Sequence, residues 1–161
     1  MRELNQVHVT DLIKLINQGP YFELLSMVMK DLGVGSCLLE VNVEEKHHNP
    51  FGGLHGGVYA STIDTATYWA AYCELDEDAG LVTLDLKVNY LAPIKKGKII
   101  VKGQRIKIGK KVGLAEAVVT DLEGKILAKG TSTLMLTPGM QTIRDVLRLR
   151  NGETLPPKFI G

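Results

Sequence analysis

The segment that most constrains the fold runs from Gly56 to Glu74 and reads GGVYASTIDTATYWAAYCE. Between Gly56 and Cys73 it carries one charged side chain, Asp64. Its length and apolar content predict a long helix, and a helix that is apolar almost all round must be buried. It is shorter than the ~20 predominantly apolar residues that cross a bilayer. We therefore expect it to lie inside a globular protein, covered by other parts of the chain.

The strands that follow this helix predict what covers it. In GLVTLDLKVNYLAP, one expected face holds Val82, Leu84, Leu86, Val88 and Tyr90, and the other holds Thr83, Asp85, Lys87 and Asn89. This alternation is typical of a half-buried strand. GKIIVKGQRIKI, KVGLAEAVVTD and KILAKGTSTLMLT predict three more strands, with hairpin turns at GKKVG and LEGK. SCLLEVNVEE predicts another strand before the helix. Consecutive hairpins make an antiparallel sheet, so we expect an α+β fold in which a five- to six-stranded sheet wraps the long helix.

The two ends of the chain lie outside this pattern. Residues 1–33 are expected to form an N-terminal helical segment, with Thr10 capping a helix that Gly19-Pro20 ends. The stretch from Tyr21 to Gly35 predicts either a second short helix or a helix that runs into a strand. The tail, 138–161, predicts a short amphipathic helix and then polar, proline-bearing residues. At 161 residues, we expect one domain with its core over 34–137.

Composition excludes several classes of function. The net charge of +1 gives no general attraction to polyanions, so we expect no nucleic-acid partner. The N-terminus has no clean apolar signal region, and we expect a cytoplasmic protein without a membrane partner. Cys37 and Cys73 are far apart and make neither a zinc spacing nor a disulfide framework, so we expect two core thiols. His47 and His48 have no partner motif for a metal, and no metal site is expected.

Asp64 has two interpretations. Its helical neighbours are Ala60, Ser61, Thr67 and Tyr68. A carboxylate on a buried helix is costly unless it is hydrogen-bonded. It therefore either holds the packing through such a bond or serves as a base or nucleophile in a partly desolvated site. The glycine-rich turn FGGLHGG before the helix adds weight to the second reading, because a helix N-terminus presents free N–H groups that can polarise a carbonyl. The alternative interpretation of this glycine-rich stretch is a tight strand-to-helix turn without a functional role.

The spacing between the turn and the acid restricts any shared site. If the helix starts near Gly56, Asp64 lies eight residues on, about 12 Å along the axis at 1.5 Å per residue. A reacting carbonyl must sit within about 3 Å of both its donor and its base or nucleophile. Two antiparallel copies related by a two-fold axis can meet this condition where one chain cannot. If both residues are catalytic, the site lies between subunits of at least a homodimer.

These residues resemble those of the hotdog-fold acyl-CoA thioesterases, and most closely the phenylacetic-acid-degradation type (PaaI-like) branch. The resemblance rests on NPFGGLHGG at 49–57, the acid Asp64, LDLKVNYLAPIKKG and EAVVTDLEGKILAKGTSTLML, and covers about residues 34–136. It implies a long helix wrapped by an antiparallel sheet, an acyl-CoA substrate, and two protomers paired as a double hotdog. Homodimers and homotetramers are both expected. No cofactor is implied, because CoA is part of the substrate.

The resemblance also implies roles for individual residues. Asp64 matches the catalytic carboxylate, a general base for water or a nucleophile on the thioester carbonyl. Gly56 matches the residue whose backbone N–H polarises that carbonyl. Asn49 matches a side chain that positions the thioester or the water, and His55 matches the motif histidine that supports the loop or contacts the thioester. Thr83 falls where some relatives carry a serine that orients the water.

A second group of residues is expected to contact the substrate. Gly57 follows the proposed amide donor in the motif. Tyr68 stands one turn after the acid, where some relatives carry threonine, and could line the acyl pocket, the core or an interface. Lys110 and Lys111 lie on a basic hairpin that could hold the CoA phosphates or be an ordinary solvated tip.

Two other functions are compatible with the same pattern. A non-catalytic acyl-CoA-binding module would not need the set Asn49, Gly56 and Asp64. A hydratase or dehydratase of the same fold places a histidine with an acid at the reacting centre, whereas His55 stands inside His-Gly-Gly. Since fold alone does not decide function, we expect a thioesterase on the strength of the motif.

Overall fold

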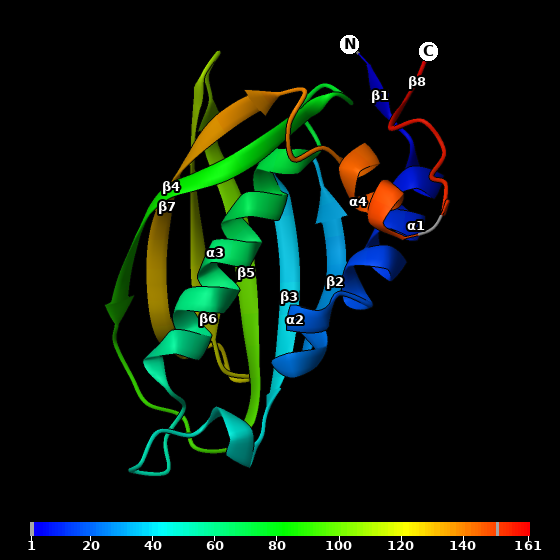
Figure 1. Cartoon of the computed structure of the whole chain (residues 1–161). Coiled ribbons are helices and arrows are strands. Elements are labelled where there is room, and N and C mark those ends of the chain that lie inside the picture. Colours follow the sequence, from blue (N-terminus) through cyan, green and yellow to red (C-terminus); the bar gives the residue numbers. More distant parts are fainter. Residues whose placement is uncertain (1, 151) are drawn as a thin grey trace.

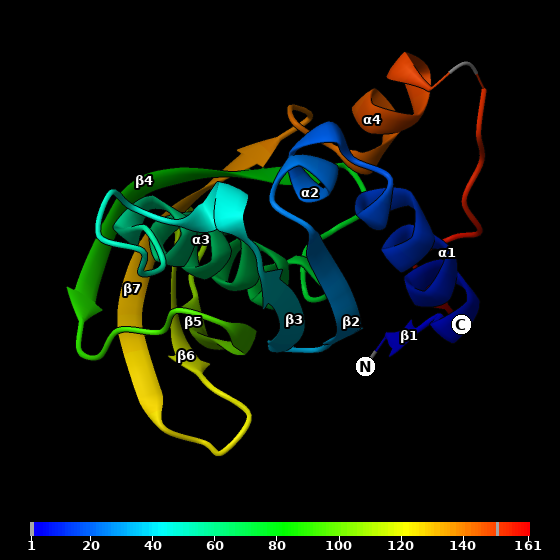
Figure 2. The same ribbon diagram turned by 90° about the horizontal axis from the view of Figure 1, so that it is seen from below.

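A long helix wrapped by one curved sheet is the centre of the molecule (Figures 1 and 2). The computed structural model describes residues 2–150 and 152–161. The helix α3 spans Gly56–Tyr72, ending two residues before the expected boundary. The strands are β2 (Met27–Gly33), β3 (Ser36–Val43), β4 (Ala79–Tyr90), β5 (Gly97–Ile108), β6 (Val112–Thr120) and β7 (Ile126–Pro138). They form a six-stranded antiparallel sheet in the order β2-β3-β5-β6-β7-β4. The expected α+β architecture is confirmed.

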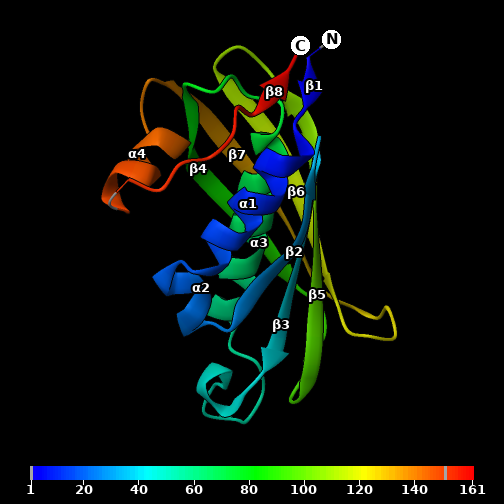
Figure 3. The same ribbon diagram turned by 90° about the vertical axis from the view of Figure 1, so that its right-hand side faces the viewer.

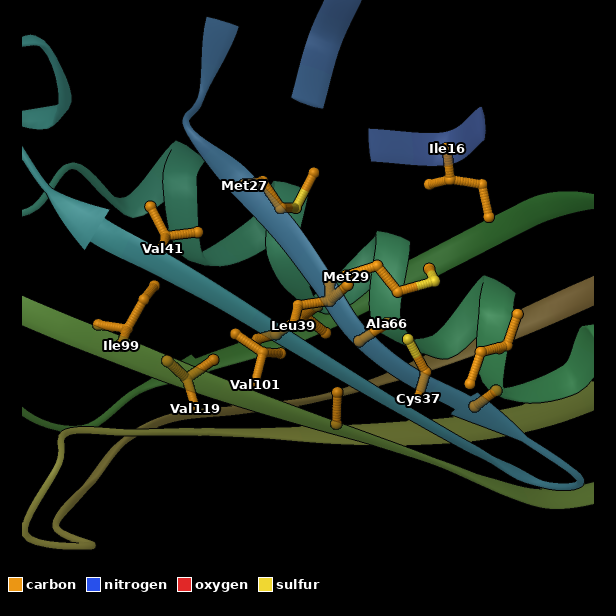
Figure 4. Packing of buried hydrophobic residues seen from close by; sticks show 14 of the residues in the cluster. Ile16, Met27, Met29, Cys37, Leu39, Val41, Ala66, Ile99, Val101 and Val119 are labelled. Carbon is orange, nitrogen blue, oxygen red and sulfur yellow. The ribbon is translucent and has the colours of Figure 1, made fainter. Parts of the chain in front are cut away.

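The core lies between α3 and the concave face of the sheet. Ile63, Ala66 and Ala70 of α3 are fully buried and belong to one apolar cluster with side chains from β2, β3, β5 and β6 (Figure 4). The closest approach is at Gly103 of β5, where a Cβ atom would overlap the backbone of Ala66. Glycine is therefore required for the sheet to approach the helix this closely.

The two cysteines lie inside the molecule. Cys37 and Cys73 are free and buried, as expected for core thiols. Burial raises the pKa of both thiols, to about 11 for Cys73. Both side chains therefore stay protonated near neutral pH and behave as small apolar residues.

The N-terminal segment differs from the expectation in two ways. The first helix, α1 (Gln6–Asn17), begins before Thr10 and is capped by Asn5, whose side chain accepts a hydrogen bond from the Val7 amide. The predicted Thr10 cap is therefore wrong: its hydroxyl donates to the Gln6 carbonyl inside the helix. The short α2 (Pro20–Leu24) then leads into β2, so the alternative of a helix running into a strand is confirmed. The segment 1–33 is thus not all helical, because β2 is an edge strand of the main sheet.

A β-bulge breaks the predicted alternation of β4. Thr83 pairs with Leu134 and Asp85 with Thr133, so Leu84 is an extra residue without a partner on β7. A bulge of this kind reverses which residues face the core. Before it, Leu81 is buried and Thr83 reaches α3; after it, Leu86 packs on the core. The predicted single face from Val82 to Tyr90 is therefore wrong, and Leu84 is 53% exposed.

The two ends of the chain meet above the end of α3 (Figures 1 and 3). Strand β1 (Glu3–Leu4) pairs with β8 (Phe159–Ile160), and the predicted tail helix is α4 (Ile143–Leu149). The Lys158 side chain is 1% exposed, and its Nζ donates to the Tyr72 carbonyl at 2.5 Å and the Leu75 carbonyl at 2.8 Å. An ammonium at the C-terminal end of a helix satisfies carbonyls that the helix leaves unpaired.

The buried Lys158 predicts a dependence of stability on pH. Burial lowers the pKa of Lys158 from an ordinary value of 10.5 to about 8. Between these two values the unfolded chain binds a proton that the folded chain has lost, so the free energy of unfolding rises with pH. We expect wild type to gain stability relative to Lys158→Met as pH rises from 8 to 10, measured by urea unfolding. A difference that is flat or falls over this range would contradict the assignment.

None of the helices in the described parts of the chain is long and apolar enough to cross a membrane.

Candidate active site

The loop that leads into α3 is fixed by its own hydrogen bonds. The Asn49 side-chain oxygen accepts from the amides of Phe51 at 2.9 Å and Gly53 at 3.2 Å. The backbone N–H of Asn49 donates to the Gly53 carbonyl at 2.8 Å. Gly52 takes the left-handed conformation, with φ at +77°, which closes this turn. In the isolated chain, Asn49 therefore shapes the loop, with its side chain half-buried.

His55 is the N-cap of α3. Its Nδ1 accepts a hydrogen bond from the Gly57 amide at 2.8 Å. A ring nitrogen that accepts a hydrogen bond carries no proton, so in the neutral ring the proton is on Nε2. This cap uses the Gly57 N–H, and a substrate contact through that amide would have to displace His55. The amide of Gly56, at the first position of α3, has no partner within the helix.

Tyr90 lies directly over Gly56, a placement that the sequence did not reveal. A Cβ atom on Gly56 would be 3.2 Å from the Tyr90 ring. Tyr90 is 57% exposed and makes an edge-to-face contact with Tyr59 at 6.0 Å between ring centroids. A shallow hollow at the start of α3 is lined by Gly56, Tyr59, Tyr90 and Leu54, among others. The sequence feature that could have pointed to Tyr90 is an aromatic residue at the end of a predicted strand. In the structure, the pairing of β4 with β7 stops at this residue.

Asp64 is bound to the sheet rather than to its helical neighbours. The Thr83 hydroxyl donates to Asp64 Oδ1 at 2.8 Å. Ser61, one of the partners expected if Asp64 were structural, instead bonds the Tyr21 hydroxyl at 2.6 Å. Asp64 is half-buried, and within the described residues its second oxygen, Oδ2, has no hydrogen-bond partner. The carboxylate is thus held by one oxygen, and the other is free to take a proton from water.

The β4 bulge brings this pair together. It lets Thr83 face α3 while Leu86, three residues on, also faces the core. The Thr83 hydroxyl therefore holds one oxygen of the Asp64 carboxylate against β4. For a reaction in which Asp64 is the base or nucleophile, we expect Thr83→Val to lower kcat about tenfold, because the carboxylate loses a hydrogen bond that a charged acceptor strengthens.

Thr83→Ser is the matched control, since it keeps the hydroxyl. We expect it to retain most of the activity, and both variants should show the same thermal unfolding midpoint within a few degrees. Equal loss in both variants would show that the packing of the threonine methyl group matters instead.

Gly56 and Asp64 lie on one helix, at positions 1 and 9 of α3. Their separation along the axis is about 12 Å. One carbonyl group therefore cannot lie within about 3 Å of both the Gly56 amide and the Asp64 carboxylate of the same chain. The edge strand β4 carries Thr83 and runs past Asp64, and among the described residues no further strand lies beside it. The geometry leaves this side of the molecule open to a second copy.

The other residues expected to contact the substrate are Tyr68, Lys110 and Lys111. Tyr68 is half-buried one turn after Asp64, and burial raises the pKa of its hydroxyl. Lys110 and Lys111 are exposed at the tip of the β5–β6 hairpin, at the end of the sheet opposite the start of α3 (Figure 1). Within the part of the chain that the structure describes, no group of three histidine, cysteine or acidic side chains could hold a metal ion.

Comparison with known proteins connects this geometry to a family. The thioesterase superfamily model matches residues 51–128, which include Gly56, Asp64 and Thr83. Human acyl-coenzyme A thioesterase 13 is 30% identical over 127 residues, covering 76% of this chain and 90% of that protein. The 1,4-dihydroxy-2-naphthoyl-CoA hydrolase of Listeria monocytogenes is 31% identical over 100 residues, covering 62% of this chain and 81% of that protein.

Solved structures show the same fold. A Haemophilus influenzae thioesterase superposes with a TM-score of 0.76 at 22% identity, covering 83% of this chain and 92% of that one. A thioesterase family protein from Silicibacter pomeroyi gives 0.74 at 25% identity, covering 83% and 98%. Identities this low support the fold, and the curated relatives support the family. The chain therefore belongs to the thioesterase superfamily of hotdog-fold thioester hydrolases.

Proposed function

We propose that the protein hydrolyses the thioester of an acyl-CoA to a free acid and CoA. The observation that carries the proposal is a half-buried carboxylate, Asp64, held by the Thr83 hydroxyl on a helix that otherwise carries no charge. The names of the two curated relatives, both CoA-thioester hydrolases, support the substrate class. Neither metal nor cofactor is needed for this chemistry.

In the proposed reaction, Asp64 and Gly56 act on opposite sides of the thioester carbonyl. The Gly56 N–H donates to the carbonyl oxygen and stabilises the negative charge that develops there. Asp64 removes a proton from water as the water oxygen attacks the carbonyl carbon. The tetrahedral intermediate collapses, the carbon–sulfur bond breaks, and the sulfur leaves as the CoA thiol with the proton from Asp64. Direct attack by the Asp64 carboxylate on the carbonyl carbon is the alternative first step, followed by hydrolysis of the anhydride.

Two chains are needed to build this site. We propose a homodimer in which Asp64 and Thr83 of one chain face Gly56, Asn49 and His55 of the other. The free edge of β4, together with the exposed Leu84, supports an interface on this side. An isologous dimer gives two equal sites. A tetramer built from two such dimers would leave the site unchanged.

The other substrate contacts follow from this arrangement. Lys110 and Lys111 are proposed to meet the CoA phosphates, since both are exposed cations on a hairpin tip. Tyr68, beside Asp64 on the same helix face, is proposed to contact the acyl group next to the thioester.

The direct test is release of CoA from a panel of aliphatic and aromatic acyl-CoAs by the purified wild-type protein. We expect turnover of at least one member, with dimer or tetramer mass by light scattering. Tight binding of acyl-CoA without turnover would favour the binding module. Hydration of enoyl-CoA without release of CoA would favour the hydratase.

A further inference from the structure

His47 is a buried histidine beside the loop that leads into α3, with a side chain that the proposed reaction does not use. It is 2% exposed, the lowest value among the histidines of this chain. It ends η1 (Glu45–His47), a short 3₁₀ helix that follows β3 at the end of the sheet where α3 begins (Figures 1 and 3). A titratable ring at this depth, next to the active-site loop, can act on the site through the backbone.

Two hydrogen bonds join His47 to the start of α3. Its carbonyl accepts the backbone N–H of His55 at 2.8 Å. Its Nδ1 accepts the backbone N–H of Glu44 at 3.0 Å, which closes η1 as a capping box. His55 directly precedes Gly56, the proposed amide donor. The carbonyl of His47 therefore holds the residue from which that donor enters the helix.

The corner between α2 and β2 supports η1. Lys46 Nζ donates to the Ser26 hydroxyl at 2.7 Å, and the backbone of Leu25 lies beside the His47 ring. Ser26 takes a φ of +49°, a left-handed conformation that costs free energy in a residue other than glycine. The active-site loop is thus held in part by an N-terminal corner that precedes the matched residues 51–128.

The second ring nitrogen of His47 is poorly satisfied. Because Nδ1 accepts, the proton of the neutral ring is on Nε2. Among the described residues, Nε2 of His47 is the one buried side-chain nitrogen or oxygen without a hydrogen-bond partner. A buried donor without an acceptor costs free energy that contact with water would recover. The docked position of His47 therefore includes an unfavourable contribution, and a second unfavourable change at the ring can displace it.

Protonation of the ring is such a change. An imidazolium donates from both nitrogens, so Nδ1 and the Glu44 N–H would face each other as two donors. Burial is the largest cause that lowers the pKa of His47 from its ordinary value of 6.5, and Lys46 and His48 act in the same direction. The Leu25 backbone and the Glu44 carboxylate act against it. A ring released into water thus binds a proton more readily than the docked ring, so acid favours release.

We propose that His47 is a positioning residue that holds the active-site loop while its ring is neutral and releases the loop when the ring is protonated. In the docked state, the His55 N–H stays on the His47 carbonyl and the Gly56 amide keeps its place. In the released state, that amide is no longer placed for the thioester carbonyl. The inference rests on the proposed function, which gives Gly56 its role. Hydrolysis then fails in acid for a reason separate from protonation of Asp64.

His47→Asn tests the proposal, because its side-chain oxygen can replace Nδ1 as the acceptor and does not titrate. The matched control is His48→Asn, since the neighbouring ring is half-buried and its Nε2 bonds the Lys95 carbonyl at 2.8 Å. We expect the fall of kcat in acid to begin about one pH unit lower in His47→Asn than in wild type. His48→Asn should follow wild type. Asp64 is intact in all three proteins, so coinciding profiles of wild type and His47→Asn would overturn the proposal.

An NMR titration of wild type needs neither turnover nor a variant that folds. We expect the His55 backbone amide to shift with the midpoint of the His47 ring, below 6.5, rather than with that of its own ring. If acyl-CoAs are hydrolysed but the amide does not follow the His47 ring, the positioning role is wrong and the proposed function stands. If the two midpoints coincide but no acyl-CoA is hydrolysed, the coupling of His47 to the loop stands and the proposed function fails.

Discussion

Replacing Asp64 by asparagine should lower kcat for acyl-CoA hydrolysis by at least 10²-fold and leave KM nearly unchanged. The amide has the shape of the carboxylate and can still accept the Thr83 hydrogen bond. It cannot take a proton from water or attack the carbonyl, and proton transfer by a positioned base contributes about 10²–10⁴-fold. The substrate contacts of the ground state are untouched, so the loss falls on the chemical step. Release of CoA, followed with a thiol reagent, measures both constants.

Asp76→Asn is the matched control for this experiment. Asp76 also loses its charge, but it is an exposed acid paired with Arg2 at 2.6 Å at the surface. Surface ion pairs contribute at most about 1 kcal/mol, so activity and stability should stay close to those of wild type. A kcat for Asp64→Asn within fivefold of wild type would remove Asp64 from the chemistry and return it to a packing role.

The long helix and the individual strands were predictable because each depends on local pattern. An uncharged stretch of helical length and alternating strands with glycine turns specify these elements without knowledge of the rest of the chain. The bulge at Leu84 was not predictable in this way. LVTLDLKVNY alternates without a break, and the shift appears only when Thr83 and Asp85 pair with adjacent residues of β7. Register is a property of two strands and cannot be read from one.

The candidate site shows the same division. Asp64, Gly56 and His55 stand in one continuous stretch, so their motif could be recognised from the sequence. Tyr90 lies 34 residues after Gly56 and reaches it through the fold alone. One apolar cavity is lined by residues of α1, α2, α3 and α4, whose sequences are separated by most of the chain. No local pattern in α4 distinguishes a cavity wall from a solvated helix.

Replacing Gly56 by proline should lower kcat by about 10²–10³-fold, the cost typical of removing one oxyanion donor. Proline deletes the N–H that we propose to polarise the carbonyl. The position tolerates it, because Gly56 is the first residue of α3, where proline is favoured. The preceding residue, His55, has φ −66° and ψ 138°, the extended conformation that proline requires before it. Helix content by circular dichroism should therefore match wild type.

Gly56→Ala separates the amide from the crowding around it. Its Cβ atom would meet the Tyr90 ring at 3.2 Å, and that exposed ring can shift by a few tenths of an ångström. The alanine variant keeps the N–H, so we expect it to retain most of the activity. If alanine and proline lower kcat equally, the displaced Tyr90 ring explains the loss and the amide has no role.

Mixing the two inactive variants tests whether the site lies between subunits. In a heterodimer of Asp64→Asn with Gly56→Pro, one site combines the intact Asp64 of the second chain with the intact Gly56 of the first. The other site carries both substitutions. Random pairing makes half of the dimers mixed, with one working site of two, so co-refolded chains should recover about a quarter of wild-type activity. If Asp64 and Gly56 of the same chain formed the site, every site would lack one group, and the mixture would stay as inactive as its parents.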